Sequence, residues 1–370
     1  MKKKRVLFLL EAFDKGGIEK VTLDIVNNLN PERYDITVQT FWYGGYCQSQ
    51  VNDNVRVIPF FFKRYVRGII RLINYLSPRL LYILFVHGNY DVEIAASDGG
   101  AAKVISGSTN RNAKKICWVH MDVMARGSQL KEFSNNNTAK NIYTKFDLIV
   151  PVSETCKENF VKKFGDAYNI KVCRNPMTIN DIRMKSQIKS DKSKFGSEKI
   201  HFVCIGRLVE QKGFDRLIEV CARLKKEGYI FFKVHILGDG LEKAKLSKLI
   251  KENNLESNVL LYGFIENPYP FIKNADVFLL TSRDEAFPLV VGESLIVGTP
   301  VIATLCCGVS EWLQDGKYGM IVENSTEGIY MGMKKVLEQP ELLDDYRITI
   351  SEFAERMFLD NELTKFEELL

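Results

Sequence analysis

Two carboxylates flank a proline in the stretch RDEAFPLVVGES, where Glu285 and Glu293 stand eight residues apart. A carboxylate can accept hydrogen bonds from sugar hydroxyl groups, and a second one can hold the diol of a ribose. Pro288 suits the first turn of a helix running to about Val297, with Gly298 closing it. Glu285 would then lie in the turn and Glu293 more than one turn inside the helix. The alternative is that Glu285 caps the helix and Glu293 is exposed on it.

The start of this helix is a second candidate for ligand binding. The segment Ala286, Phe287, Pro288 and Leu289 would direct its free backbone N–H groups out of the helix N-terminus. Such groups favour negative charge, so a phosphate or a sugar hydroxyl could bind there.

Two cations occur in the stretch IGRLVEQKGFDRLIEV. A strand is expected to end at Gly206, and Arg207 and Lys212 then lie in the loop before a helix that begins near Phe214 or Asp215. Cations beside a helix N-terminus make a site for a multiply charged anion such as a diphosphate. The alternative is that both are solvated loop charges. The spacing does not match a P-loop, which requires G-x4-G-K-[ST].

The first half of the chain offers two weaker candidates. Gly16 and Gly17 lie between the first predicted strand and its helix, where glycines let a backbone approach a phosphate or sugar closely. A plain tight turn explains them equally. His120 ends the predicted strand KKICWVH, where it should project toward a ligand, although a lone histidine is more often structural.

Strand-like runs alternate with amphipathic helical patterns along the whole chain, which predicts parallel sheets covered on both faces, built twice. The first-half runs are RVLFLL, YDITVQTFW, VRVIPF, DVEIAAS, KKICWVH, FDLIVPVS and IKVCRNP, and the second-half runs are IHFVCIG, FKVHILG, NVLLYG, DVFLLTS, PVIATLC and GMIVE. We therefore expect Rossmann-like domains at 1–178 and 200–349, a polar linker at 179–199, and a C-terminal helix at about 350–370 packed back on the first domain. In open α/β sheets, ligands sit beyond the carboxyl ends of the strands, where the candidate residues occur.

The composition is consistent with two globular domains, because the chain has 370 residues and 46% of them are hydrophobic. Residues 1–175 carry 26 Lys and Arg against 16 Asp and Glu, so an anionic surface is the simplest partner for this half. Eight cysteines show no C-x-x-C spacing and predict buried reduced thiols of a cytosolic protein rather than a zinc site. The apolar run Val6–Leu10 is too short for a signal peptide.

Two further patterns are absent from the sequence. The GDG at 238–240 has Lys243 at the third glycine position, so the dinucleotide fingerprint fails and a nicotinamide-dependent oxidoreductase is disfavoured. No D-x-D occurs, so this motif for bridging a metal ion to a diphosphate is missing. We therefore expect no metal and no cofactor, with Arg207, Lys212 and helix dipoles neutralising a leaving diphosphate.

A basic amphipathic segment lies in FFFKRYVRGIIRLINYLSPRLLYILFV. Lys63, Arg64, Arg67 and Arg71 recur at helical steps, and no acidic residue occurs between Asn54 and Tyr90. Such a face suits an anionic membrane surface, at ~1 kcal/mol for each basic residue near it. The alternative is a core-packed helix with a wet basic side. The stretch LLYILFV after Pro78 is expected to be a core element.

The second half resembles the nucleotide-binding domain of family 4 type glycosyltransferases, whose two Rossmann-like parallel-sheet domains face across a cleft in the GT-B architecture. The resemblance rests on GRLVEQKG, EAFPLVVGE, GTPVIAT and GVSEWLQDGKYGMIV, in this order, over most of 200–323. Two positions depart from the family pattern: Ala286 stands where many members have Gly, and Leu305 where many have Asp.

The resemblance implies a role for each candidate. Arg207 and Lys212 would bind the donor diphosphate, Glu285 would lie at the donor sugar, and Glu293 would hold the ribose. The glycine loop at Gly16 and Gly17 would lie near the donor phosphates. His120 would hydrogen-bond a hydroxyl of the transferred sugar.

The implied function is retaining transfer of a hexose or N-acetylhexosamine from a nucleotide sugar, such as a UDP-sugar, to an oligosaccharide or lipid-linked acceptor in cell-surface polysaccharide biosynthesis. The expected location is the cytoplasm, peripherally on the inner face of the cell membrane, with no nucleic-acid partner. Two alternatives stay open. One is a UDP-sugar 2-epimerase on the same architecture, and the other is a noncatalytic protein that binds nucleotide sugars.

Overall fold

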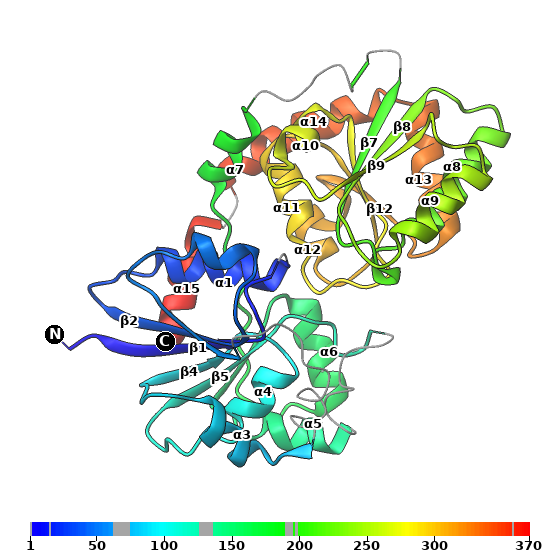
Figure 1. Cartoon of the computed structure of the whole chain (residues 1–370). Coiled ribbons are helices and arrows are strands. Elements are labelled where there is room, and N and C mark those ends of the chain that lie inside the picture. The colour runs from blue at the N-terminus through cyan, green and yellow to red at the C-terminus, as the bar shows by residue number, and fades with distance from the viewer. Residues whose placement is uncertain are drawn as a thin grey trace. The chain divides into compact units, whose positions relative to one another are not determined.

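The computed structural model describes residues 2–14, 16–61, 75–125, 136–188, 195–196, 199–356 and 359–370. The chain forms two compact units, Met1–Met177 with Leu359–Leu370, and Thr178–Phe358 (Figure 1). Among the described helices, none combines the length and apolar character needed to cross a bilayer.

The first unit is built on a six-stranded sheet whose strands all pair in parallel, in the order β3-β2-β1-β4-β5-β6. The strands are β1 (Lys4–Leu10), β2 (Tyr34–Trp42), β3 (Arg56–Phe61), β4 (Val92–Ala95), β5 (Lys114–Val119) and β6 (Leu148–Pro151). Nearly every residue of the central strands is buried, as expected for strands covered on both faces.

Helices cover both faces of this sheet, with α1 and α15 on one face and α3, α4 and α5 on the other (Figure 1). The helices of the unit are α1 (Gly17–Asn28), α3 (Pro78–Phe85), α4 (Gly100–Ile105), α5 (Asn136–Tyr143), α6 (Glu154–Phe164) and α15 (Leu359–Leu369), with a 3₁₀ turn η1 (Tyr46–Gln50). The C-terminal helix α15 docks through Phe366, whose ring lies 6.0 Å from that of Phe8 and 5.0 Å from that of Trp118. The helix therefore completes the core of a unit formed by the beginning of the chain.

The second unit repeats the plan with another all-parallel sheet, in the order β12-β11-β10-β7-β8-β9. The strands are β7 (Ile200–Ile205), β8 (Phe232–Leu237), β9 (Val259–Gly263), β10 (Val277–Leu280), β11 (Val301–Thr304) and β12 (Gly319–Val322). Counted from its own first strand, each unit has the spatial order 3-2-1-4-5-6, which is the doubly wound Rossmann arrangement. The fold class predicted from strand and helix alternation is confirmed.

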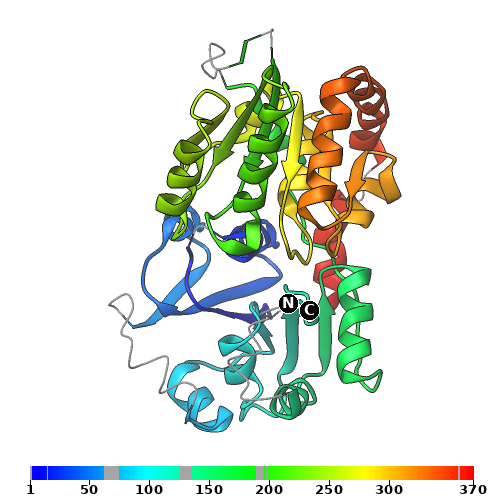
Figure 2. The same cartoon turned by 90° about the vertical axis from the view of Figure 1, so that its right-hand side faces the viewer.

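Helices α8, α9 and α13 lie on one face of this sheet and α10, α11 and α14 on the other (Figures 1 and 2). The helices are α7 (Ile179–Ser186), α8 (Phe214–Lys226), α9 (Lys243–Glu252), α10 (Tyr269–Asn274), α11 (Leu289–Ile296), α12 (Val309–Leu313), α13 (Thr326–Glu338) and α14 (Leu342–Arg356), with 3₁₀ turns η4 (Glu210–Lys212) and η5 (Gln314–Gly316).

Two local expectations differ from the structure. The run IKVCRNP is not a strand: Ile170 makes only an isolated bridge to Ile149, because the edge strand β6 ends after four residues. Part of the expected linker is the helix α7, which packs on α10 and α11 and buries Ile179 and Ile182.

The packing under α11 depends on a glycine. Gly292 lies against the indole of Trp312, and a Cβ added to Gly292 would stand 2.4 Å from the ring atom Cη2. Trp312 is almost fully buried and also stacks on Phe287, with ring centroids 4.6 Å apart. The tryptophan therefore fixes how closely α11, which carries Glu293, approaches α12.

Gly292→Ala should destabilise the protein by about 1–3 kcal/mol, because the added methyl group overpacks a site already filled by an aromatic ring. Denaturant unfolding measures this change. The control is the same substitution in a Trp312→Leu background, where the ring is gone and the added cost of Gly292→Ala should largely disappear. Equal costs in both backgrounds would contradict the packing explanation.

Candidate functional site

The centre of the candidate site is an ion pair between Lys212 and Glu285. Lys212 Nζ lies 2.6 Å from Glu285 Oε1, and the two side chains are 19% and 12% exposed. Lys212 ends the turn η4 after β7, and Glu285 follows β10, the strand beside β7. The strand order reverses between these two strands, and ligands of open α/β sheets bind at such a switch point.

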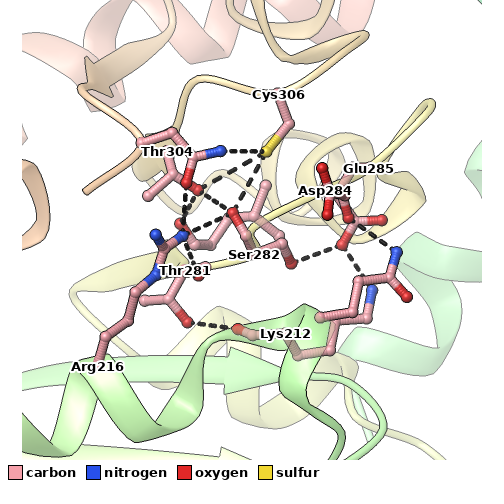
Figure 3. A network of polar contacts seen from close by, with 11 residues as sticks. Lys212, Arg216, Thr281, Ser282, Asp284, Glu285, Thr304 and Cys306 are labelled. Carbon is pink, nitrogen blue, oxygen red and sulfur yellow. Dashed lines mark hydrogen bonds and ion pairs between the residues drawn. The ribbon is translucent and has the colours of Figure 1, made fainter. Parts of the chain in front are cut away.

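The sequence around the pair explains its geometry. Gly206 directly follows β7, and the aliphatic stem of Lys212 passes 3.3 Å from the position that a Cβ of Gly206 would take. Lys212 O accepts a hydrogen bond from Thr281 Oγ1 at 2.9 Å, and Glu285 Oε1 accepts one from Ser282 Oγ at 2.6 Å (Figure 3). The end of β10 therefore holds both members of the pair.

A second ion pair ties the same two loops together. Arg283 donates to both carboxylate oxygens of Asp215, each at 2.8 Å, and to Glu210 O at 2.6 Å. Burial raises the pKa of Asp215, but the Arg283 guanidinium outweighs this and holds the pKa below its usual value. Such a bidentate pair fixes orientation as well as distance. The loop after β7 and the loop after β10 thus behave as one body.

A polar network holds the backbone of the loop after β10 (Figure 3). The buried Arg216 donates to Thr281 O, Ser282 O and Asn324 Oδ1. Cys306 Sγ also donates to Ser282 O, at 3.3 Å, and burial raises the pKa of this thiol to about 12. The thiol is therefore protonated at neutral pH and serves as a donor.

Arg207 differs from the other cations of the site. It follows Gly206, its side chain is exposed, and within the described part of the chain that side chain makes no hydrogen bond or ion pair. Lys212 is neutralised by Glu285 and Arg283 by Asp215, so Arg207 supplies positive charge that is not already paired. An anion arriving at this edge of the sheet would meet an available guanidinium.

Glu285 and Glu293 occupy different environments. Glu293 is the fifth residue of α11, only 4% exposed, and Glu293 Oε1 accepts a hydrogen bond from Tyr269 Oη at 3.2 Å. The N-cap of α11 is Pro288, and no side chain caps the helix. The alternative interpretation, with Glu285 as cap and Glu293 exposed, is therefore wrong.

The start of α11 is partly hidden. Ala286, Phe287 and Pro288 are buried and Leu289 is half-buried, because Phe287 stacks on Trp312. Pro288 is the N-cap rather than a residue of the first turn, so the helix begins one residue later than expected. These four residues still follow directly on Glu285, so the helix N-terminus and the ion pair share one edge of the sheet.

In the first unit, Gly16 is the N-cap of α1 and Gly17 its first residue. The carboxylate of Glu19 folds back over this end, and a Cβ on Gly16 would stand 2.1 Å from Glu19 Oε2. Glutamate at this third helical position typically turns toward the N-cap backbone. A phosphate at this helix N-terminus would have to displace or be shared with that carboxylate.

His120 is the first residue after β5, one position beyond the expected strand end. Its backbone N–H donates to Asp98 Oδ2 at 2.8 Å, and its ring lies 4.4 Å from that of Trp118. Nε2 is buried and bonds to no other described residue, and desolvation lowers the pKa of His120 to about 3. The imidazole is neutral at physiological pH, with a polar atom available for a ligand hydroxyl.

The structure joins Lys212 and Glu285 directly in the second unit. Arg207 lies in the same loop as Lys212, the segment 286–289 follows Glu285, and Glu293 lies further along α11, hydrogen-bonded to Tyr269. Gly16, Gly17 and His120 lie beyond the carboxyl ends of strands of the first unit. The basic residues Lys63, Arg64, Arg67 and Arg71 lie outside the described residues. In the part of the chain that the structure describes, no three or more His, Cys, Asp or Glu side chains lie close enough together to bind a metal ion.

Sequence reasoning missed the residues that orient the site. They are Gly213, Asp215, Arg216, Tyr269, Thr281, Ser282, Arg283, Cys306 and Asn324. Arg216 carried one detectable signal, since it lies one helical turn before Val220 on the apolar face of α8. A charge at a core-facing position indicates a specific buried partner. The hydroxyl and amide groups of the other residues carried no such signal.

A half-open hollow lies away from this site. A cavity of about 510 Å³ is lined by Phe195, Lys199, His201, Asn274 and Asp276, among others. Lys199 and Asp276 directly precede β7 and β10, so the cavity lies at the amino edge of the sheet, opposite the candidate site. The candidate site is therefore defined by its polar geometry and its place at the switch point, and not by this cavity.

Residues 185–352 match the family model described as glycosyl transferases group 1. The N-acetylgalactosamine-N,N'-diacetylbacillosaminyl-diphospho-undecaprenol 4-alpha-N-acetylgalactosaminyltransferase of Campylobacter jejuni is 32% identical over 229 residues, which are 61% of this chain and 60% of that protein. An uncharacterised glycosyltransferase of Haemophilus influenzae is 26% identical over 92% of both chains.

Among solved structures, Anabaena HepE in complex with UDP-glucose superposes with a TM-score of 0.77 at 18% identity, over 99% of this chain and 100% of that one. At this identity the likeness establishes the fold, which is GT-B. The alignment spans about three fifths of the C. jejuni enzyme, so it covers only part of that protein. Residues 185–352 are therefore similar to the glycosyl transferases group 1 family, and the chain has the GT-B fold.

Proposed function

We propose that the chain is a retaining glycosyltransferase that moves a hexose or N-acetylhexosamine from a UDP-sugar to an oligosaccharide or lipid-linked acceptor in cell-surface polysaccharide biosynthesis. The observation that carries this proposal is the Lys212–Glu285 pair at the switch point of the second sheet, beside the unpaired Arg207. Cations and a carboxylate at one strand end suit a ligand that has phosphates next to a sugar.

The diphosphate would bind to Arg207 and Lys212. A guanidinium and an ammonium at a helix start neutralise the negative charge that grows on the leaving UDP as its bond to the sugar breaks. Lys212 lies at this edge of the sheet. On ligand binding, its ammonium group would donate a hydrogen bond to a phosphate oxygen while its contact with Glu285 weakens. We propose that these two cations stabilise the leaving UDP without a metal ion.

Glu285 would then face the sugar ring, and Glu293 would contact the ribose while Tyr269 holds it in place. In retention, the acceptor hydroxyl attacks the anomeric carbon on the face from which UDP departs, and its proton passes to the departing phosphate oxygen. The name of the C. jejuni relative includes an α linkage. Retention gives an α linkage in the product when the nucleotide sugar is α-linked. Its name also includes a diphospho-undecaprenol acceptor, which supports the lipid-linked class.

Lys212→Ala should weaken UDP binding and lower transfer on the order of a hundredfold, because one of two charges at the leaving group is lost. Isothermal titration with UDP and an assay with a panel of UDP- and GDP-sugars measure both effects. Lys226→Ala, at the exposed end of α8, is the control. Near-normal turnover of Lys212→Ala, or strict dependence of the wild type on a divalent metal after EDTA treatment, would contradict the proposed roles. Release of free sugar without an acceptor would instead indicate an epimerase.

His120 is proposed to hydrogen-bond a sugar hydroxyl as a neutral imidazole. Its pKa is lowered by burial from 6.5 to about 3. Below pH 6.5 the unfolded chain therefore binds a proton that the folded chain does not, and stability falls as the pH falls.

His120→Gln should remove this acid penalty. Between pH 7.5 and pH 5, the free energy of unfolding of the variant should improve relative to wild type by about 2 kcal/mol. Denaturant titrations at both pH values measure the difference. If the free energy of unfolding of the variant differs from that of wild type by the same amount at both pH values, the imidazole is accessible to protons in the folded state.

Peripheral membrane contact is proposed for the segment that contains Lys63, Arg64, Arg67 and Arg71. The described helix that follows it, α3, buries Leu81, Tyr82 and Phe85 but exposes Leu80, Ile83 and Leu84. The expectation that this stretch is a core element therefore holds for only one face of the helix. An exposed apolar face next to a basic sequence suits the surface of an anionic bilayer.

Replacing Arg64, Arg67 and Arg71 with Glu should release the protein from vesicles that contain anionic lipid, because three attractions become repulsions. Co-sedimentation with phosphatidylserine vesicles measures binding. The matched control reverses three lysines of α9, Lys243, Lys248 and Lys251, and should sediment like wild type. Equal sedimentation of both variants would rule out this surface as the contact.

A further inference from the structure

Arg216 is a buried cation without an acidic partner in its hydrogen bonds. It is the third residue of α8 and only 6% exposed. Its Nε donates to Thr281 O at 3.0 Å, and its Nη2 lies 2.7 Å from Thr281 O, 2.8 Å from Ser282 O and 2.7 Å from Asn324 Oδ1. All the acceptors are neutral, so the side chain holds backbone rather than balancing a carboxylate.

The stability of the fold does not explain why a guanidinium is buried at this position. Removing a guanidinium from water is costly, and well-packed apolar residues are often as stable as a buried charge. Burial accordingly lowers the pKa of Arg216. What a guanidinium offers that an apolar side chain does not is a rigid planar set of donors, able to hold two successive carbonyl groups in one orientation.

The two carbonyls held by Arg216 belong to the residues that orient the ion pair. Thr281 Oγ1 donates to Lys212 O at 2.9 Å, and Ser282 Oγ donates to Glu285 Oε1 at 2.6 Å. The bond between Lys212 Nζ and Glu285 Oε1, also 2.6 Å, closes a ring of five residues (Figure 3). A displacement of Arg216 would therefore move both the lysine backbone and the carboxylate.

Gly213 makes the close approach of the two loops possible. It is the N-cap of α8 with φ of +68°, a conformation that side chains disfavour. A Cβ at this position would stand 2.1 Å from Thr281 O and 2.8 Å from Arg216 Nε. Any side chain at Gly213 would push the carbonyl away from the guanidinium.

We propose that Arg216, admitted by Gly213, is a positioning residue that sets the distance and orientation of Lys212 and Glu285 for the bound nucleotide sugar. Arg216 does not itself touch the ligand. The inference rests on the proposed function of the Lys212–Glu285 site and assigns the residue that controls its geometry. Misplacement of reacting groups by about 1 Å can cost on the order of a hundredfold in rate, so a small shift of this ring is enough.

Arg216→Lys tests the proposal, because it keeps the charge and removes the planar fork. We expect UDP to bind about tenfold more weakly and kcat/KM with the UDP-sugar to fall on the order of tenfold to a hundredfold, per folded molecule. Arg223→Lys, on the exposed side of the same helix, is the matched control and should match wild type in both measurements. Circular dichroism and thermal melting give the folded fraction of each variant.

A double-mutant cycle separates positioning from a structural role. In a Lys212→Ala background the ring is already open, so adding Arg216→Lys should weaken UDP binding by less than twofold further. Independent effects, in which the two losses multiply, would overturn the proposal. Gly213→Ala should reproduce the loss of UDP affinity seen with Arg216→Lys, which keeps the test valid if the arginine variant folds poorly.

The outcomes also distinguish this inference from the proposed function. If wild type binds no UDP and transfers no sugar, the proposed function fails and the inference with it. If wild type binds UDP and transfers sugar but folded Arg216→Lys matches it in affinity and rate, only the positioning role is wrong. A lower melting temperature with normal activity per folded molecule would likewise show that Arg216 is merely structural.

Discussion

The ion pair of Lys212 and Glu285 is the interaction on which the candidate site depends. It joins the loops after two adjacent strands, at the place where the order of the second sheet reverses. A parallel sheet brings the carboxyl ends of its strands to one edge, and a reversal of order leaves a gap between the two loops that flank it. The pair lies at that gap, and the helix starts of α8 and α11 belong to the same two loops.

Much of the polar structure around the pair serves to hold it. The Arg283–Asp215 pair joins the loops from the side, and Arg216, Asn324 and Cys306 hold the backbone of the second loop. Buried polar networks of this kind are costly when incomplete, because each unsatisfied group has lost its water. Each residue of the network therefore needs its partners to be present. Arg207 does not belong to this network. Its side chain is exposed and unpaired within the described residues, so it is available to bind an anion.

The comparisons agree with this physical description and extend it. The family match falls on residues 185–352, which contain every member of the Lys212–Glu285 network. The first unit carries candidates of a different character: a neutral histidine whose Nε2 is buried, and a glycine pair covered by the Glu19 carboxylate.

The sequence by itself predicted the fold class, the approximate limits of the twelve described strands, and the charged candidates Arg207, Lys212, Glu285 and Glu293, because alternating apolar runs and charges at strand ends are local signals. It did not predict that Lys212 and Glu285 pair with each other. It did not determine how those charges are held. Thr281 and Ser282 are ordinary polar residues until the switch point brings them beside Lys212 and Glu285, and the hydrogen-bond partner of Glu293, Tyr269, lies on another helix. The limits of the IKVCRNP run and of α7 were also missed, since a short edge strand and two docked isoleucines are decided by neighbours distant in sequence. Contacts between residues far apart along the chain form only when the sheet assembles, so the tertiary structure alone decided which polar groups meet.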